Sequence, residues 1–178
     1  MLYIIILFLL LIYCVLIVFV LGSSFIAVVL GGVPFVNTSK QDIEFIVKEL
    51  KISSKDIFYD LGSGHGSTIF LVEKLSGAKV KGFELALWAH LLAKIKSNFL
   101  KSHAKFVLGN FFKHSWTEAN YVYAYLFPPL MARVEEKFLA DCKPGSTAII
   151  RDFPFPNLKA VAVYKMPKKH KIYIYKKV

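Results

Sequence analysis

Three glycines at alternate positions, directly after a short apolar run, constrain the fold of this chain more than any other feature. The run is Ile57–Leu61, the glycines are Gly62, Gly64 and Gly66, and a helical pattern begins at Ser67. Glycine has no Cβ atom and adopts positive φ without strain, so a ligand can approach its backbone closely. A strand that leads through a glycine turn into a helix N-terminus often binds a nucleotide-like ligand with its backbone. We therefore predict such a site here, with a purely structural tight turn as the alternative.

The spacing of the glycines separates the possible cofactors. Dinucleotide-binding folds use G-x-G-x-x-G, whereas the third glycine here comes one residue earlier, and the lysine of a P-loop is absent. The pattern from Asp60 to Gly66 resembles motif I of class I S-adenosylmethionine-dependent methyltransferases. This resemblance implies that S-adenosylmethionine is the cofactor and that it is bound by Asp60, Gly62, Ser63, Gly64 and Gly66.

A glutamate further along the chain supports this interpretation. The strand predicted at 79–84 ends in Glu84, which follows Gly66 by 18 residues. A carboxylate at such a strand end can accept hydrogen bonds from both ribose hydroxyls of an adenosine, as it does in dinucleotide folds. We predict that Glu84 and the adjoining Leu85 bind the cofactor. The alternative is a solvated glutamate at a strand end.

Strands and helices alternate along the chain after residue 39. The predicted strands lie near 56–61, 79–84, 104–109, 121–126, 146–150, 159–165 and 171–177. A helix capped by Ser39 comes before them, and further helices are predicted near 66–76, 86–101 and 129–141. Alternation implies a parallel sheet, whereas the last two strands leave no room for a helix and imply an antiparallel hairpin. The fold class is therefore α/β, with the Rossmann-like seven-stranded sheet of class I methyltransferases.

Three of these helices carry apolar stripes that we expect to face the core. The stripes are Ile43, Ile46, Val47 and Leu50 in the first helix, Trp88, Leu91, Leu92, Ile95 and Phe99 in the helix near 86–101, and Val134 and Phe138 in the helix near 129–141. Their i, i+3, i+4 and i+7 spacing is typical of a helix that buries one face.

An uncharged N-terminal segment precedes the domain. Residues 2–21 form an unbroken apolar run, long enough to cross about 30 Å of hydrocarbon as a helix. We predict one transmembrane anchor at 1–22, ended by Gly22-Ser23-Ser24, then an apolar interfacial linker at 23–38 and a methyltransferase domain at 39–178. A cleaved signal peptide is the alternative, although signal peptides have a basic n-region and a shorter apolar stretch.

Every Lys, Arg, Asp and Glu lies after residue 36, so the domain carries the whole net charge of +11. The positive-inside rule then predicts that the domain faces the cytosol or the equivalent side of a membrane. A basic surface attracts anionic headgroups or nucleic acid. Because the lysines are mostly scattered, we expect the membrane as a partner and no nucleic acid. The two cysteines and five histidines show no metal-ligand spacing, so we expect no metal.

Nearly the whole chain resembles a narrower family, the membrane-anchored protein lysine methyltransferases of mitochondria and their prokaryotic relatives. The mitochondrial members modify the ATP synthase c subunit and the adenine nucleotide translocase. The similarity rests on the anchor and on the segments Val33–Val36, Asp60–Gly64, Phe83–Leu85 with Trp88, and Arg151–Pro156. This family usually has Gly-Asp-Gly-Arg where the present chain has Gly64-His65-Gly66-Ser67.

The resemblance also implies roles for residues that follow the later strands. Asn110 would meet the adenine amino group through its carbonyl oxygen, and Phe111 would line the adenine ring. A turn asparagine is the alternative for Asn110. The candidates for the methyl-transfer pocket are Tyr125, Phe127, Pro128 and Phe153. No general base is assigned, so the catalytic residues stay unknown.

These features together predict an S-adenosylmethionine-dependent protein-lysine N-methyltransferase that acts on an integral membrane protein. A methyltransferase of a lipid, quinone or other small molecule is one alternative, and labelled methyl would then enter solvent-extractable material. A non-catalytic module that keeps the fold is another, motivated by His65 and Ser67. Such a module would bind the cofactor without turnover.

Overall fold

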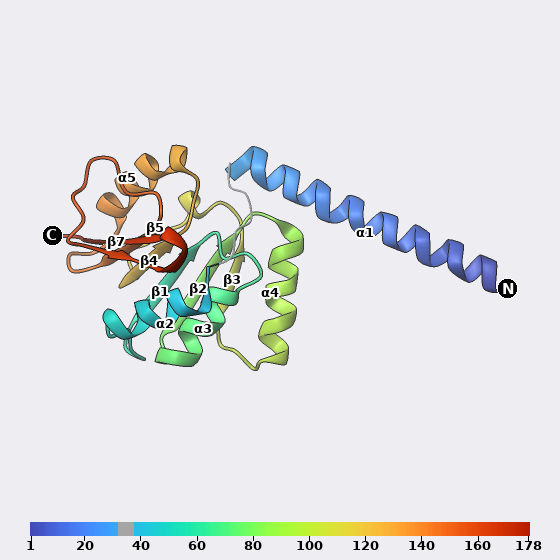
Figure 1. Cartoon of the computed structure of the whole chain (residues 1–178), viewed down its shortest axis with the longest axis horizontal. Helices are drawn as coiled ribbons and strands as arrows, with labels where there is room; N and C mark the ends of the chain where they lie inside the picture. Colours follow the sequence, from blue (N-terminus) through green and yellow to red (C-terminus); the bar gives the residue numbers. More distant parts are fainter. Residues whose placement is uncertain (32–37) are drawn as a thin grey trace.

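The computed structural model describes residues 1–31 and 38–178 (Figure 1). The helices are α1 (Leu2–Gly31), α2 (Lys40–Glu49), α3 (Ser67–Ser76), α4 (Leu87–Phe99) and α5 (Met131–Asp141). The strands are β1 (Ile57–Leu61), β2 (Lys79–Glu84), β3 (Lys105–Leu108), β4 (Tyr121–Ala124), β5 (Thr147–Arg151), β6 (Ala162–Lys165) and β7 (Lys171–Lys176). Three short 3₁₀ helices are η1 (Phe111–Lys113), η2 (Pro128–Leu130) and η3 (Pro167–Lys169). The predicted segment Val33–Val36 lies outside the described residues.

The seven strands form one sheet in the order β3-β2-β1-β4-β5-β7-β6. The strands from β3 to β5 pair in parallel, and β7 pairs antiparallel with both β5 and β6. Both features confirm the predicted sheet with its C-terminal hairpin. The connection from β3 to β4, which the structure describes throughout, contains only the short helix η1. Because β1, β2, β4 and β5 run parallel, their carboxyl ends meet at one edge of the sheet, where ligands bind in such sheets.

Two apolar cores lie on opposite faces of the sheet. One face packs against α2 and α3 through Phe58, Ile69 and Val72, and the other packs against α5 through Val134 and Phe138. The predicted inward direction of Val134 and Phe138 is confirmed, since both are fully buried. On α2, Ile43, Ile46 and Val47 are buried and Leu50 is partly buried, also as predicted.

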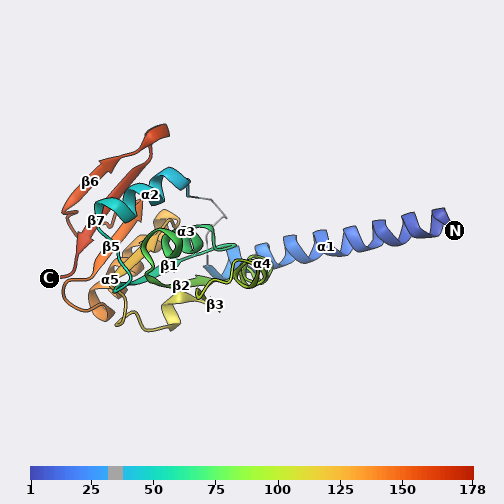
Figure 2. The same ribbon diagram turned by 90° about the horizontal axis from the view of Figure 1, so that it is seen from below.

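The stripe predicted to lie in the core on α4 is exposed, so that prediction is wrong. Figure 2 looks along α4 at the edge of the domain. The buried residues of this helix are Ala89, His90 and Ala93, and the exposed ones include Leu91, Leu92, Ile95 and Phe99. The small alanines let the helix backbone approach the sheet closely, and the larger apolar side chains then point outward. Trp88 is partly buried and packs beside Leu85, Ala86 and Ala89.

The N-terminal helix α1 continues through Gly22-Ser23-Ser24 to Gly31, so the predicted break is wrong. A glycine inside a helix costs only about 1 kcal/mol. The Ser23 hydroxyl donates to the Val20 carbonyl at 3.3 Å, which satisfies it within the helix. Among the described residues, Leu2–Phe25 is the one span long and apolar enough to cross a membrane, a test that a signal sequence also passes.

A buried ion pair joins α2 to the end of β5. The Arg151 Nη2 atom lies 2.8 Å from Asp42 Oδ2, and both side chains are 3% exposed. Ser39 caps α2 as predicted, because its hydroxyl accepts a hydrogen bond from the Asp42 N–H at 3.1 Å. The preceding residue, Thr38, shares a 2.6 Å hydrogen bond with the hydroxyl of Tyr123. These contacts fix the start of the domain to the centre of the sheet.

Candidate active site

The glycine turn is held against the end of β2. The N–H groups of Gly62 and Ser63 both donate to the Phe83 carbonyl at 2.9 Å. The φ angles of Gly62, Gly64 and Gly66 are 95°, 54° and 85°, in the left-handed region that glycine adopts without strain. All three glycines are therefore required by the shape of the turn.

A glycine in β2 brings the turn and the strand into direct contact. A Cβ atom on Gly82 would lie 2.5 Å from the Ser63 hydroxyl oxygen, and one on Gly66 would lie 2.8 Å from ring atoms of Phe70 and Phe106. Gly82 was not singled out from the sequence. A glycine inside a strand, which often marks a close approach of another segment, was the available signal.

Glu84 binds the backbone around the glycine turn. Its carboxylate accepts hydrogen bonds from the N–H groups of Gly64 at 2.8 Å, Leu85 at 2.8 Å and Ala86 at 2.7 Å. A carboxylate has about four acceptor positions, so at least one remains for a ligand hydroxyl. The structure thus brings together Gly64, Glu84 and Leu85, which were chosen from separate parts of the sequence.

Asp60 lies at the end of β1, beside this carboxylate, and is almost fully buried. Burial, and then the negative charge of Glu84, raise the pKa of Asp60 to about 8. A buried carboxylate with a second, partly buried one beside it is destabilised when both groups are ionised, and a positively charged ligand nearby would relieve this. The site therefore favours a cationic group.

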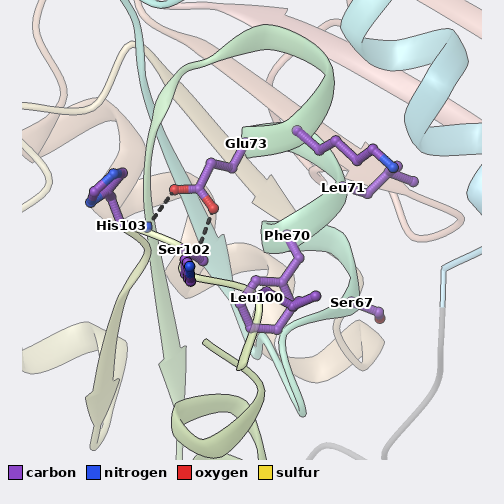
Figure 3. Close-up of a pocket in the computed structure, with 9 residues that line it drawn as sticks. Ser67, Phe70, Leu71, Glu73, Leu100, Ser102 and His103 are labelled. Carbon is purple, nitrogen blue, oxygen red and sulfur yellow. Dashed lines mark hydrogen bonds between the residues drawn. The ribbon is translucent and has the colours of Figure 1, made fainter. Parts of the chain in front are cut away.

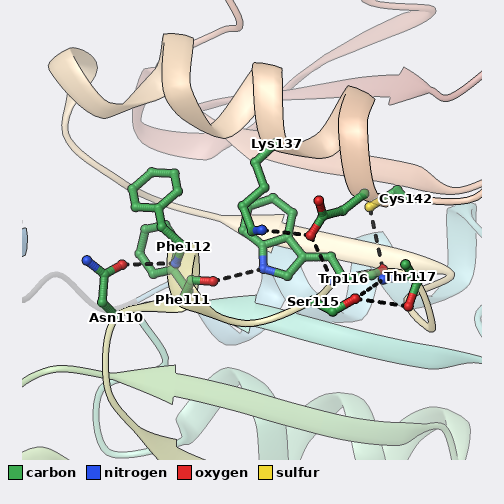
Figure 4. Close-up of polar contacts among 9 residues, drawn as sticks. Asn110, Phe111, Phe112, Ser115, Trp116, Thr117, Lys137 and Cys142 are labelled. Atoms are coloured by element: carbon green, nitrogen blue, oxygen red, sulfur yellow. Dashed lines mark hydrogen bonds and ion pairs between the residues drawn. The ribbon is translucent and has the colours of Figure 1, made fainter.

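Asn110 and Phe111 form a turn that packs on the α5 side of the sheet (Figure 4). The Asn110 Oδ1 atom accepts a hydrogen bond from the Phe112 N–H at 2.9 Å, which leaves one lone pair for another donor. Phe111 is buried, and its carbonyl accepts from the Trp116 indole N–H at 3.2 Å. The adenine-binding roles of both residues stay predictions. Trp116, which anchors this turn, was not singled out from the sequence.

The pocket candidates lie at the ends of β4 and β5. The rings of Tyr125 and Phe153 stack with centroids 6.4 Å apart, and the Arg151 guanidinium lies 4.7 Å from the Tyr125 ring centre. Phe127 is exposed, and Pro128 begins η2 on the neighbouring loop. Burial, and then the charge of Asp152, raise the pKa of Tyr125, so its phenol stays protonated at neutral pH. Tyr125 can therefore donate a hydrogen bond but does not act as a base.

Asp152 is a further residue of this edge that sequence reasoning missed. Its φ of 62° is unusual for a residue other than glycine, and such strain often occurs at functional sites. Its carboxylate oxygens lie 2.8 Å from His170 Nδ1 and accept from the Lys171 N–H at 2.9 Å. These contacts hold the strained backbone of Asp152, which directly precedes Phe153. No sequence pattern pointed to this long-range pairing.

Two grooves occur elsewhere on the domain. One of about 520 Å³ lies between α3 and the segment before β3, where Glu73 accepts hydrogen bonds from Ser102 and from the His103 N–H (Figure 3). The second, of about 540 Å³, lies over β1 and β2 and includes Lys79 and Lys81. Neither groove contains Asp60, Glu84 or Tyr125, so both are separate from the candidate active site.

The comparison with protein families covers this edge of the sheet. Residues 60–162 match the model of the ANTKMT methyltransferase domain, from Asp60 at the glycine turn to the first residue of β6. The chain belongs to the ANTKMT methyltransferase family. Its fold agrees with that of an RNA methyltransferase from Salinibacter ruber in complex with S-adenosyl-L-homocysteine, with a TM-score of 0.75 at 21% identity. That likeness covers 79% of this chain and 93% of the other and shows the fold alone.

Two relatives of this ANTKMT-family chain are named protein-lysine methyltransferases. A protein-lysine N-methyltransferase of Saccharolobus islandicus (strain REY15A) is 28% identical over 152 residues, which are 80% of this chain and 92% of that protein. A Rattus norvegicus lysine N-methyltransferase of the ATP synthase c subunit is 27% identical over 144 residues, covering 79% of this chain and 66% of the rat protein. The chain is therefore a class I methyltransferase with S-adenosylmethionine as its cofactor.

The residues of the ANTKMT-family site fit this cofactor. The glycine turn leaves space beside the backbone, Glu84 keeps an acceptor position for hydroxyls, and Asp60 with Glu84 favours a cation. S-adenosylmethionine carries hydroxyls on its ribose and a positive charge on its sulfonium. Among the described residues, no group of three or more His, Cys, Asp or Glu side chains is arranged to hold a metal ion.

The buried Asp60 carboxyl should make the stability of the cofactor-free protein depend on pH. Its pKa is about 8 in the folded state and 3.8 in the reference state, so the folded state binds the extra proton. The resulting stability is complete below about pH 4 and is lost as the pH rises toward 8. We therefore expect the free energy of unfolding to fall as the pH rises from 5 to 8.

Denaturant titrations of wild type and Asp60→Asn across this pH range test the expectation. Asparagine mimics the protonated acid, so the variant should lose less stability than wild type as the pH rises. Equal slopes for the two proteins would show that Asp60 is ionised in the folded state.

Proposed function

We propose that the chain is a membrane-anchored protein-lysine N-methyltransferase that modifies an integral membrane protein. The observation that carries this proposal is the contact between the apolar helix and the active-site edge. The Trp88 indole N–H, in the first turn of α4, donates to the Ser24 hydroxyl of α1 at 2.8 Å. Trp88 follows Glu84 by only four residues, so the cofactor site lies close to the end of the apolar span.

The segment that joins α1 to the domain is held by a hydrogen bond near each of its ends. Ser24 is bound to Trp88 on the anchor side, and Thr38 is bound to Tyr123 on the domain side. Helix α1 runs to Gly31, and the chain from there to Thr38 spans at most about 25 Å even when fully extended. The active site would therefore sample lysines near the headgroup layer, with the domain on the cytosolic or equivalent face. The net charge of +11 favours an anionic membrane over cationic soluble proteins.

The chemistry requires little beyond positioning. The cofactor, when bound, supplies a methyl group activated by the positive sulfur. The substrate lysine must first lose a proton to water, and an apolar surrounding favours this because it lowers the pKa of the amine. Tyr125 and Phe153 offer a stacked aromatic wall for the lysine stem, and the Tyr125 phenol oxygen can accept a hydrogen bond from an amine N–H, which leaves the nitrogen lone pair free. The nitrogen lone pair forms the new N–C bond while the S–C bond breaks, which in-line placement accelerates.

Proteomics of lysine methylation tests the substrate. A strain carrying Gly62→Arg and Gly64→Arg would be compared with wild type and with Lys143→Arg, a surface control on the loop after α5. We expect a methyl mark to disappear from a lysine at the membrane edge of an integral protein in the glycine variant alone. Loss of marks only from soluble proteins would contradict the proposal, and so would a lipid or quinone that lacks one methyl.

Alkaline carbonate extraction tests the anchor separately. The full-length chain should stay with the membrane pellet, because α1 is of spanning length. A soluble domain whose N-terminus begins near Ser23 would show that the segment is a cleaved signal peptide.

A further inference from the structure

The outward side of α4 carries a large apolar surface that the described parts of the domain leave open. We call it the α4 apolar face, and its residues are Leu87, Leu91, Leu92, Ile95, Phe99 and, just after the helix, Leu100. Ile95 is 51% exposed and Phe99 is 84% exposed. A continuous apolar surface of this kind on a helix usually marks a site of contact with a membrane or a partner.

Positive charge surrounds the α4 apolar face. Lys94, Lys96 and Lys101 are exposed on or directly after the helix. No aspartate or glutamate occurs in the sequence between Glu84 and Glu118. An exposed apolar stripe flanked by lysines is typical of helices that lie at the surface of an anionic bilayer, and Glu73, the acidic residue beside Lys101, is engaged by Ser102 and the His103 N–H.

The position of α1 places this face beside the membrane. Figures 1 and 2 show α1 leaving the domain past α4 and extending beyond that edge, whereas α4 runs across the direction of α1. The Trp88–Ser24 hydrogen bond fixes the beginning of α4 at the level where the apolar span of α1 ends. Tryptophan is enriched at this level of membrane proteins because its ring is apolar and its N–H is polar.

We propose that α4 lies in the headgroup region of an anionic bilayer, with Ile95 and Phe99 in the acyl boundary and the lysines at lipid phosphates. The inference rests on the proposed anchoring of α1. It adds a second, interfacial attachment that fixes the rotation of the domain about its anchor. The cofactor turn beside the start of α4 is thereby held at one orientation to the membrane.

A depth-sensitive fluorophore on single cysteines tests this arrangement in the full chain. Cys14 is replaced by alanine, while Cys142 can remain because burial raises the pKa of its thiol to about 12. The label is attached at Ile95→Cys, Phe99→Cys, Leu10→Cys in α1 or Glu136→Cys on the exposed side of α5. The protein is reconstituted in vesicles with equal parts of phosphatidylcholine and phosphatidylglycerol, with a quencher on the lipid chains.

Positions 95 and 99 should be quenched at least about twofold more than position 136, and less in vesicles without phosphatidylglycerol. Quenching at Leu10 but not at 95 or 99 would overturn the interfacial helix and leave the anchor intact. An unquenched Leu10 would overturn the anchor, and the inference with it. Quenching at 95 and 99 that requires an added membrane protein would assign the face to a protein partner instead.

A functional variant provides a second readout. Ile95→Glu with Phe99→Glu should raise the KM for a substrate embedded in the bilayer at least about fivefold while kcat is kept. The same variant should methylate a detergent-solubilised substrate at the wild-type rate. An unchanged KM for the bilayer-embedded substrate would overturn the interfacial helix, and so would an equal loss of activity on both substrates.

Discussion

Replacing Glu84 by alanine should lower the affinity for S-adenosylmethionine at least about tenfold. A hydrogen bond to a charged group contributes about 1.5–3 kcal/mol, and the carboxylate is predicted to accept from the ribose hydroxyls. The substitution also removes the acceptor for the N–H groups of Gly64, Leu85 and Ala86. The turn would then lose one of its links to β2 as well as a ligand contact, while the Gly62 and Ser63 N–H groups still donate to the Phe83 carbonyl, so tenfold is a lower bound.

Isothermal titration calorimetry of the full chain in detergent measures this effect. Glu136→Ala on the exposed side of α5 is the matched control and should bind like wild type. Circular dichroism of Glu84→Ala checks that the sheet is still formed. Unchanged affinity in a folded Glu84→Ala protein would remove Glu84 from the cofactor site.

Asp42→Ala should destabilise the domain by up to about 3–5 kcal/mol, because it removes the nearest carboxylate from the buried Arg151 guanidinium and leaves Asp152, at 4.0 Å, as the more distant acidic neighbour. The two side chains are 2.8 Å apart and equally buried, so water cannot replace the lost carboxylate easily. The effect should also reach the pocket, since Arg151 lies over the Tyr125 ring. The change therefore links the stability of the domain to the shape of the methyl-transfer edge.

Denaturant titration of the variant measures the loss, with Lys40→Ala as the control. Lys40 pairs with Glu44 at 3.4 Å on the surface of the same helix, and exposed pairs of this kind contribute about 0–1 kcal/mol. A double variant, Asp42→Leu with Arg151→Met, should be more stable than Asp42→Ala because the buried guanidinium is removed together with the carboxylate. Equal effects for Asp42→Ala and Lys40→Ala would contradict the buried-pair argument.

The strands and most helices could be predicted because their signals are local. The run before Asp60, the glycine turn and the strand ending in Glu84 each specify their own conformation. A parallel sheet then brings the strand ends together. The N-cap Ser39 and the inward Val134 and Phe138 are confirmed for the same reason, since capping and helical periodicity depend on residues within two turns.

Which face of α4 is buried could not be predicted from its periodicity. The stripe from Leu91 to Phe99 shows which residues share a face, but it does not show whether protein covers that face. The contact with the sheet is made instead by Ala89 and Ala93, whose small size gives no strong apolar signal. Helix α1 likewise continues through a glycine and two serines, since the Ser23 hydroxyl donates to the preceding turn and the Ser24 hydroxyl accepts from Trp88 of α4, which composition alone does not reveal.

Contacts between side chains that are far apart in the sequence could not be predicted either. Asp42 meets Arg151, and Asp152 meets His170, only because β5 lies between β4 and β7. The strain at Asp152 and the close contact of Gly82 with Ser63 also depend on contacts between distant parts of the chain. A single sequence carries no measure of such couplings.

The place of β7 in the sheet has a consequence for biosynthesis. It is made after every other strand, yet it lies between β5 and β6 and pairs with both. The edge of β5 therefore stays open until β7 has left the ribosome, whereas α1, which we propose to be the membrane anchor, precedes the whole sheet and would enter the bilayer first. The unfinished domain would wait at the membrane surface, where an unpaired strand edge invites aggregation. A chaperone that acts on this chain would thus have to work at the membrane.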